Sequence, residues 1–359
     1  MSIKIGLAGN PNCGKTTMFN DLTGSTQYVG NWPGVTVEKK GGKLKGHKDV
    51  EIVDLPGVYS LSPYTLEEVV TRNFMIEDKP DAIINIVDAS NIERNLYLTT
   101  QILELGIPTV IALNMMDIVE KNGDKIDLNK LSDILGCPVI ETSALKGKGI
   151  KEVAEKAVEL ANEKKKFNFE VPYSEECKNA LSEIEKFAKE NLSSSNIESK
   201  YLAIKLFERD EKIVEKLQLN ESSLKEIENI VKKCEDELDD DSESIITSDR
   251  YAFIGTIVSK AIKKANNSNE STSDKIDKII TNRFLALPIF AAIMWAVYYI
   301  SVSSIGTIVT DWTNDTLFGE IVAGNVGNWL QALGVADWLY SLIIDGLIGG
   351  VGAVLGFVP

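Results

Sequence analysis

The sequence predicts three parts in order: an α/β domain with a mostly parallel sheet, a small all-helical domain, and the beginning of an α-helical membrane domain. Short apolar runs alternate with amphipathic stretches over residues 1–165, and strand-like runs disappear over 166–265. No Lys or Arg follows Arg283 in the 359-residue chain. The formal net charge of −15 argues against a nucleic-acid-binding protein, because an acidic surface repels phosphate backbones.

The first part contains five apolar runs, each short enough to be a buried strand. The stretches between them have helical spacing, and this alternation favours a parallel sheet covered on both faces. The expected strands are 3–8, 50–53, 82–87, 109–113 and 138–141, and the expected helices are 16–23, 66–77, 92–105, 128–135 and 149–164.

Residues 166–265 are expected to form several amphipathic helices. Charged and apolar residues interleave at helical spacing, as in Ala180, Ile184 and Phe187, and polar breaks occur at 193–196 and 239–242. No motif in this part carries recognisable chemistry. Residues 266–283 are then expected to be a polar linker that ends in a basic juxtamembrane segment.

Residues 284–359 are expected to contain two transmembrane segments. The first, 284–310, has no charged residue and is long enough to cross a bilayer; the second, 338–359, is interrupted by Asp345. Basic residues precede the first segment and none follows it, so the positive-inside rule places 1–283 in the cytoplasm and 311–337 outside a cell membrane. Two segments cannot enclose a solute path, so we expect this sequence to be the front part of a longer multi-pass protein.

A phosphate-binding loop is indicated between the first expected strand and the first expected helix. GNPNCGKT matches GxxxxGK[ST], in which backbone N–H groups wrap the phosphates. Lys15 is expected to reach the β- and γ-phosphates, and the Thr16 hydroxyl to bind Mg²⁺. The residues expected to line this site are Gly9, Asn10, Pro11, Asn12, Cys13, Gly14, Lys15, Thr16 and Thr17.

The DLPG sequence directly after the second expected strand predicts a contact with Mg²⁺ and the γ-phosphate. The Asp54 carboxylate can hold the ion through water, and the Gly57 N–H can reach the phosphate. Leu55 and Pro56 complete this element. Val58 stands where Ras-type enzymes carry the glutamine that orients the attacking water. Intrinsic hydrolysis is therefore expected to be slow and to need help from backbone, a cation or another segment.

Residues 28–37 lie between the first helix and the DLPG strand, and we expect them to form a loop over the γ-phosphate. Thr36 would supply a hydroxyl to Mg²⁺ and release it on hydrolysis. Thr26 is a rival for this role. Thr36 is favoured because it follows the Pro-Gly pair and directly precedes the next strand.

The NMMD sequence after the fourth expected strand predicts recognition of guanine by Asn114, Met115 and Asp117. One carboxylate can accept from both N1–H and the 2-amino group of guanine, and adenine has no such pair of donors. A backbone N–H of the segment with Ser143, Ala144 and Leu145 can meet the 6-oxo group. The motifs in this order predict a P-loop GTPase with a Ras-like G domain that binds GTP and GDP.

With these motifs in place, the whole chain resembles the FeoB family of prokaryotic ferrous iron transport proteins. The resemblance is carried by GNPNCGKT (9–16), NWPGVTVE (31–38), DLPGVYSLS (54–62), EEVVTR (67–72), NMMD (114–117) and DGLIGGVGAVLGFVP (345–359). It implies a G domain, a helical domain similar to a guanine-nucleotide-dissociation inhibitor, and a membrane domain that moves Fe²⁺. It also implies a small cytoplasmic companion protein and contact with membrane lipid.

The resemblance further implies a K⁺ site. In potassium-stimulated relatives a P-loop asparagine holds K⁺ where Ras-type enzymes place an arginine finger, and Asn12 matches that asparagine. Backbone carbonyls of Gly30 and Trp32 would complete the K⁺ shell. The expected catalytic residues are then Lys15, Thr36, Gly57 and Asn12.

Two other classes remain open from the sequence: a soluble ribosome-assembly or tRNA-modifying GTPase, and a nucleotide-sensing module that does not hydrolyse GTP. The acidic charge and the apolar segment after Arg283 oppose the first of these. The sequence also leaves the oligomeric state open, including a homo-oligomer.

Overall fold

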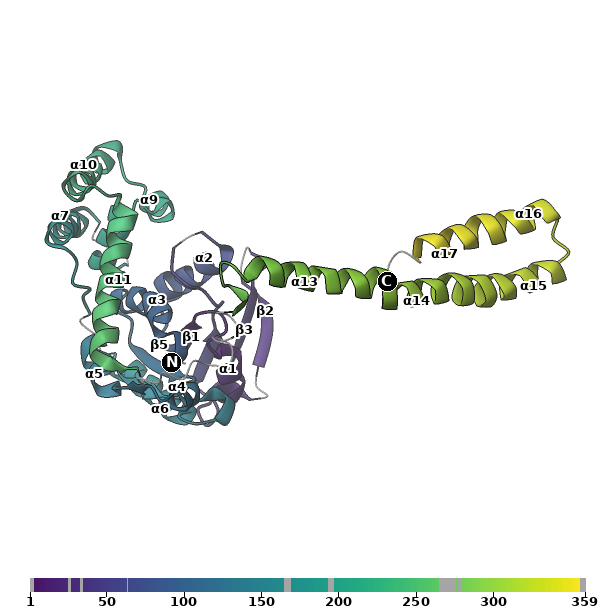
Figure 1. The fold of residues 1–359 in the computed structure, drawn as a ribbon. Coiled ribbons are helices and arrows are strands. Elements are labelled where there is room, and N and C mark those ends of the chain that lie inside the picture. The colour runs from purple at the N-terminus through teal and green to yellow at the C-terminus, as the bar shows by residue number, and fades with distance from the viewer. Residues whose placement is uncertain are drawn as a thin grey trace. The chain divides into compact units, whose positions relative to one another are not determined.

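The computed structural model describes residues 3–24, 27–32, 35–62, 64–164, 169–192, 197–264, 276 and 279–355. The chain divides into two compact units, Met1–Asn266 and Asn267–Pro359. The first unit combines a sheet with helices, and the described part of the second is helical (Figure 1).

A seven-stranded sheet in the order β2-β3-β4-β1-β5-β6-β8 forms the centre of the first unit. The strands β4, β1, β5, β6 and β8 are parallel, as predicted, and every residue of β5 is buried, as expected for a parallel strand covered on both faces. The seven strands are β1 Ile3–Gly9, β2 Gln27–Asn31, β3 Glu38–Lys43, β4 Val50–Asp54, β5 Ala82–Asp88, β6 Thr109–Asn114 and β8 Val139–Glu141.

Helices cover both faces of this sheet. On one face α1 and α6 pack against alternate residues of the central strands, including Ile5, Ile84 and Val110. On the other face α2 and α3 enclose a core that contains Leu55 and Ile83. The helices are α1 Lys15–Thr23, α2 Leu66–Asn73, α3 Ile92–Glu104, α4 Met116–Asn122, α5 Leu128–Leu135 and α6 Ile150–Glu163, with short turns η1 Phe74–Asp78, η2 Ala89–Asn91 and η3 Ala144–Lys146.

The expectation of a loop over residues 28–37 is wrong for its first part. Residues 27–31 form strand β2, which pairs antiparallel with β3 at the edge of the sheet. The Trp32 ring is buried and packs edge-on against Phe74, 5.7 Å between ring centroids. This anchor holds the end of β2 against the core, so the strand is extended although its own residues are all exposed. Pro33, Gly34 and the rival Thr26 lie outside the described residues.

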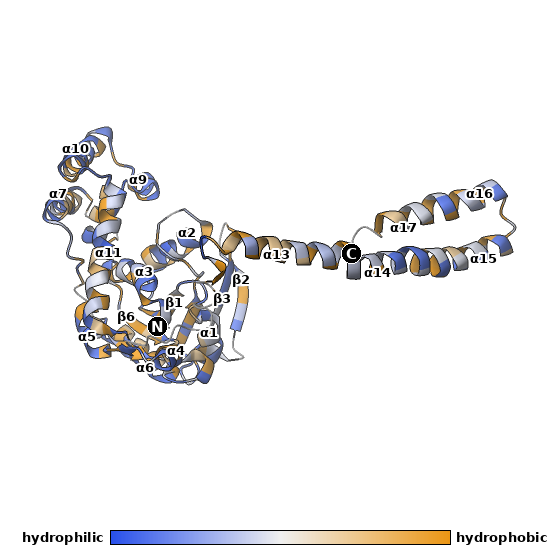
Figure 2. Cartoon of the chain, in the orientation of Figure 1, coloured by the Kyte–Doolittle hydropathy of each residue, from blue (hydrophilic) through white to orange (hydrophobic). Residues whose placement is uncertain are grey.

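A bundle of helices follows the G-domain part within the same unit. It is formed by α7 Glu175–Asn191, α8 Ser199–Phe207, α9 Glu211–Leu217, α10 Glu221–Leu238 and α11 Ser242–Ala261. Hydrophilic residues alternate with hydrophobic ones along α7 and α10 (Figure 2), and Cys177, Ile184 and Val231 lie in the bundle core.

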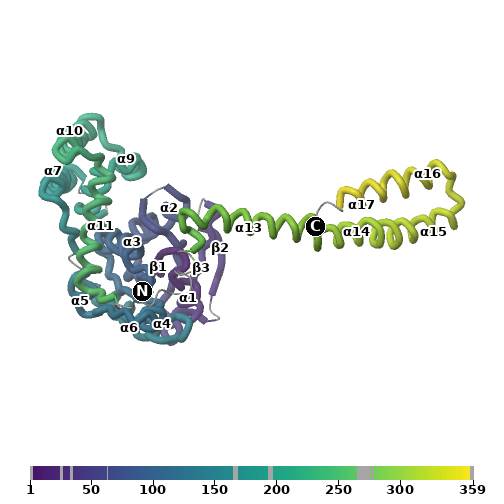
Figure 3. The backbone as a smooth tube through the Cα atoms, viewed as in Figure 1, coloured from purple at the N-terminus to yellow at the C-terminus, as the bar shows by residue number. Residues whose placement is uncertain are grey.

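Helix α11 belongs to both parts of the first unit. Its first half lies in the bundle, and its second half packs Phe253, Ile254 and Ile257 into a core shared with α3 and α5. The tube trace shows this path from the α10 end to the α5 end (Figure 3). The short strands β7 Lys125–Ile126 and β9 Ile262–Lys263 pair antiparallel at its end.

The second unit contains two helical stretches that are long and apolar enough to cross a membrane, Ala286–Ala332 and Asp337–Leu355. The first stretch continues as a helix well beyond residue 310, where the sequence predicted the span to end. Residues 311–332 contain no proline, so no residue there forces the helix to stop. The first stretch consists of α13 Ala286–Tyr298, η4 Tyr299–Ser304, α14 Ile305–Asp311, η5 Trp312–Ala323 and α15 Gly324–Ala332. The second consists of α16 Asp337–Ser341, η6 Leu342–Ile348 and α17 Gly349–Leu355.

Candidate functional site

The GNPNCGKT loop connects β1 to α1, as predicted, and its backbone requires glycine at two positions. Gly14 has φ +93°, and a Cβ atom there would lie 2.3 Å from Asn114 Nδ2. A Cβ atom on Gly9 would lie 2.7 Å from the Ile86 carbonyl oxygen of the neighbouring strand. The loop is therefore wrapped tightly over the ends of the central strands.

Cys13 is a packing residue of this loop. Burial raises the pKa of its thiol to about 11, although nearby Lys15 opposes the shift. The thiol is therefore protonated at neutral pH and is not a nucleophile. Cys13 contributes to the site through its backbone carbonyl, which accepts a hydrogen bond from Asn114.

Lys15 and Asp54 meet at the carboxyl edge of the sheet. β1 and β4 pair with Leu7 opposite Asp54, and the Lys15 Nζ lies 3.3 Å from the Asp54 Oδ1. Both side chains are largely buried, at 13% and 9% exposure. Burial raises the pKa of the Asp54 carboxyl, and the ammonium group of Lys15 opposes that shift.

The segment after Asp54 packs directly on the phosphate-binding loop. The Leu55 N–H donates to the Leu7 carbonyl at 3.0 Å, and the Val58 N–H donates to the Gly9 carbonyl at 3.4 Å. A Cβ atom on Gly57 would lie 3.2 Å from the Pro11 Cα. Pro56 is half-buried between these contacts.

The Asn114 side chain joins two of the predicted motifs to each other. Its Nδ2 donates to the Cys13 carbonyl at 2.8 Å, and its Oδ1 accepts from the Ala144 N–H at 2.9 Å. Met115 follows with φ +64°, which turns the chain into α4. Asn114 was predicted to contact the base, and in this structure both ends of its amide are used to fix the loop framework.

Asp117 lies at the start of α4 beside the segment that follows β8. Its Oδ1 accepts from the Ser143 hydroxyl at 3.0 Å, and its Oδ2 lies 3.5 Å from the Lys146 Nζ. The hydrogen bond from Ser143 lowers the pKa of the carboxyl below its usual value. Ala144 is buried, whereas the Leu145 side chain is 88% exposed. Asp117 is therefore an ionised acceptor on a surface open to a ligand.

The predicted metal ligands differ in how far they are brought together. Asp54 is in place next to Lys15, and the Thr16 and Thr17 hydroxyls are exposed at the start of α1. Thr36 is also exposed, and no hydrogen bond joins it to the described P-loop residues. The structure therefore brings Lys15 and Asp54 together, whereas Thr36 is shown only as an exposed residue before β3.

The residues predicted to bind K⁺ differ in their surroundings. Asn12 is exposed and has φ +64°. Gly30 lies in the exposed strand β2, and the Trp32 carbonyl accepts a hydrogen bond from the Val35 N–H at 3.3 Å.

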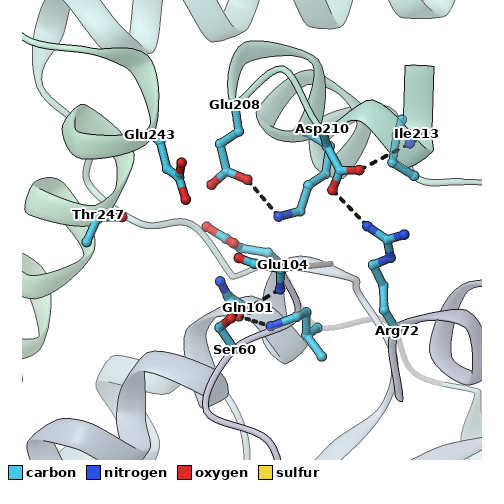
Figure 4. A network of polar contacts seen from close by, with 12 residues as sticks. Ser60, Arg72, Gln101, Glu104, Glu208, Asp210, Ile213, Glu243 and Thr247 are labelled. Carbon is cyan, nitrogen blue, oxygen red and sulfur yellow. Dashed lines mark hydrogen bonds and ion pairs between the residues drawn. The ribbon is translucent and has the colours of Figure 1, made fainter. Parts of the chain in front are cut away.

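Sequence reasoning missed a set of buried polar contacts between the G-domain part and the helical bundle (Figure 4). The Arg250 Nη2 lies 2.8 Å from the Glu104 Oε2, and Arg72 pairs with Asp210 at 2.8 Å. The partners are far apart in the chain and belong to no motif, so a single sequence carries no signal for them.

Two family models match this chain. "Ferrous iron transport protein B" matches residues 3–157, and "FeoB cytosolic helical domain" matches residues 173–263. The mostly parallel sheet with its P-loop and the helical bundle correspond to these two parts, and the fold is that of a P-loop GTPase.

Curated relatives match nearly the whole chain. "Fe(2+) transporter FeoB" of Staphylococcus aureus (strain MSSA476) is 36% identical over 358 residues, which are 98% of this chain and 53% of that protein. "Fe(2+) transporter FeoB" of Escherichia coli (strain K12) is 37% identical over 366 residues, 99% of this chain and 46% of that protein. The chain thus spans about half the length of the curated relatives it matches.

Solved structures from S. thermophilus match the first unit. A GDP-bound mutant of NFeoB is 45% identical, covers 73% of this chain and 100% of its own, and has a TM-score of 0.69. NFeoB bound to GDP·AlF4⁻ and K⁺ is 46% identical, with coverage of 71% and 98% and a TM-score of 0.64.

Proposed function

The chain belongs to the FeoB family of ferrous iron transport proteins, and from this we propose that its first unit binds guanine nucleotides and hydrolyses GTP to GDP and phosphate. The observation that carries the proposal is the Asn114 amide, which ties the phosphate loop at Cys13 to the Ala144 segment. These two hydrogen bonds would hold the segment that carries Asp117 in place relative to the loop that carries Lys15. Phosphate and base groups of one nucleotide can then bind at the same edge of the sheet.

We propose Mg²⁺ as the metal of this site. Hydroxyl and carboxylate oxygens are the ligands that Mg²⁺ prefers, and Thr16, Thr36 and Asp54 provide them. The Asp54 Oδ1 supports the fit: it is buried and lies near Lys15 without a well-aligned hydrogen bond, so it keeps a lone pair for coordination. Bound Mg²⁺ would neutralise charge on the β- and γ-phosphates.

The roles of the remaining residues follow from their positions. Lys15 would bind the phosphates once it leaves Asp54, and the Gly57 N–H would reach the γ-phosphate. Asp117 would read guanine, beside Ser143, Ala144 and Leu145. We propose K⁺ at Asn12 with the Gly30 and Trp32 carbonyls, and slow hydrolysis that K⁺ accelerates; a relative's structure with GDP·AlF4⁻ and K⁺ supports this.

At the level of the whole protein, we propose that GTP-dependent changes in this unit regulate Fe²⁺ transport through a membrane domain of which residues 284–359 are a part. Residues 1–283 would then be cytoplasmic. A relative in Porphyromonas gingivalis is a fusion of Fe(2+) transport protein A with FeoB, which supports a small companion protein as a partner.

The decisive experiment is a competition titration on the chain in detergent micelles. Wild type should bind a fluorescent GDP analogue that GTP displaces and ATP does not. The Asp117→Asn variant should bind GTP at least tenfold more weakly and gain affinity for xanthosine triphosphate, because the amide offers a donor to the xanthine carbonyl. Unchanged GTP affinity in this variant would show that Asp117 does not read the base.

A further inference from the structure

Residues 1–165 contain two arginines, Arg72 and Arg94. Of these two, only Arg72 forms an ion pair among the described residues. Arg72 is buried against Asp210, with 3% of each side chain exposed. Arg94 lies in the first turn of α3, is exposed, and borders an open cavity of about 310 Å³. A change at Arg94 therefore leaves the packed core intact.

The Arg94 side chain contacts the segment that follows Gly57. Its guanidinium carbon lies 4.0 Å from the centroid of the Tyr59 ring, within the range of a cation–π contact. Tyr59 is half-exposed, at 41%, and is two residues from Gly57. Its neighbour Val58 donates its N–H to the Gly9 carbonyl of the phosphate loop.

The Arg94 backbone contacts the phosphate loop itself. The Asn10 Nδ2 donates to the Arg94 carbonyl at 3.4 Å, and Asn10 is 3% exposed. One residue of α3 thus touches both elements that would enclose the γ-phosphate: the loop through its carbonyl and the Gly57–Tyr59 segment through its side chain.

We propose that Arg94 is a positioning residue for GTP hydrolysis, which fixes the Gly57–Tyr59 backbone against the phosphate loop through the Tyr59 ring. The inference rests on the proposed function. The Val58 side chain cannot orient water. Hydrolysis therefore depends on backbone groups of this segment, which must be held in the correct position. Arg94 acts through Tyr59 and touches no reacting atom.

The test compares single-turnover GTP hydrolysis and GDP affinity in the chain in detergent micelles. Arg94→Gln and Tyr59→Leu should each slow hydrolysis by about three- to tenfold and change GDP affinity less than twofold, because the contact acts on the γ-phosphate side. Arg94→Lys and Tyr59→Phe keep a cation and a ring, and should retain most of the rate. Lys151→Gln, at a 90% exposed side chain, is the control for loss of one positive charge.

The double variant Arg94→Gln/Tyr59→Leu should be no slower than the slower single variant, since both remove the same contact. A rate within twofold of wild type in Arg94→Gln, or a double variant that loses the product of the two single effects, would overturn the inference.

Hydrogen exchange separates this result from a failure of the proposed function. Without nucleotide, the amides of residues 57–60 should exchange faster in Arg94→Gln than in wild type and in Lys151→Gln. Unchanged exchange would overturn the role of Arg94 even in a chain that hydrolyses GTP. A wild-type chain that binds no GTP would instead overturn the proposed function.

Discussion

Arg72 and Asp210 form a buried ion pair that joins α2 of the G-domain part to the start of α9 in the helical bundle (Figure 4). The Arg72 Nη1 lies 2.8 Å from the Asp210 Oδ2, while the Asp210 Oδ1 accepts the Ile213 N–H at 3.1 Å. One carboxylate therefore caps α9 and neutralises Arg72 of α2. The bundle is thereby fixed to the helix that follows the DLPG element.

Breaking this pair on one side should destabilise the first unit strongly. We expect Asp210→Asn to lower the free energy of unfolding by about 3–5 kcal/mol, because it leaves the Arg72 charge buried without a partner. Urea unfolding measures this. The matched control is Lys216→Gln, which breaks an exposed ion pair with Glu77 between α9 and η1 and should cost less than about 1 kcal/mol. Equal effects of the two variants would contradict the importance of burial here.

Glu208 should make stability depend on acid pH. Burial alone would raise its pKa, yet Lys205 and Arg250, at 2.6 and 3.0 Å, hold the pKa of the carboxyl below its ordinary 4.5. A depressed pKa gives stability that is complete above the unfolded-state pKa and is lost as pH falls through the folded-state value. Glu208→Gln should therefore lose about 3 kcal/mol near pH 7.

The measurement for Glu208 is urea unfolding between pH 3 and pH 8. The difference between wild type and Glu208→Gln should be constant from pH 8 down to about pH 5.5 and then shrink as Glu208 takes up a proton. Glu215→Gln, at an exposed position, should follow wild type throughout. A difference that stays the same down to pH 3 would show that the carboxylate charge is not what stabilises this cluster.

The parts of the site that the sequence could predict are those attached to strand ends. Lys15, Asp54 and Asp117 follow apolar runs, and the carboxyl ends of parallel strands lie at one edge of the sheet, so their placement along that edge follows from the topology. The strand over 27–31 escaped prediction because its residues are exposed and depend on the buried Trp32 for their position. The Arg72–Asp210 pair spans 138 residues without a motif, so only the tertiary structure reveals it.

Thr36 should act only when a γ-phosphate is present. In this structure the Thr36 side chain is exposed, and Lys15 and Asp54 pair with each other. We expect Thr36→Ala to leave GDP affinity within about twofold of wild type and to slow single-turnover hydrolysis about tenfold or more, because one Mg²⁺ ligand is lost. Thr36→Ser keeps the hydroxyl and should retain most of the rate. An unchanged rate in Thr36→Ala would move the switch role to Thr26 or another residue.

Potassium should accelerate hydrolysis because neither arginine of residues 1–165 is free to bind the phosphates in the part of the chain that the structure describes. Arg72 is held by Asp210, Arg94 stacks on Tyr59, and Val58 cannot orient water. Charge that develops on the β–γ bridge still requires a positive partner. K⁺ at Asn12 would supply it without displacing Mg²⁺ from Thr16.

We therefore expect several-fold faster GTP hydrolysis in KCl than in NaCl at equal ionic strength, measured by phosphate release from the chain in detergent micelles. Asn12→Ala should remove the difference between the salts and leave Mg²⁺-dependent GDP binding largely intact. Asn122→Ala, at an exposed asparagine in the last turn of α4, is the control and should keep the preference for K⁺. Equal rates in the two salts, with GTP binding shown in both, would leave Asn12 as a residue whose positive φ shapes the loop and nothing more.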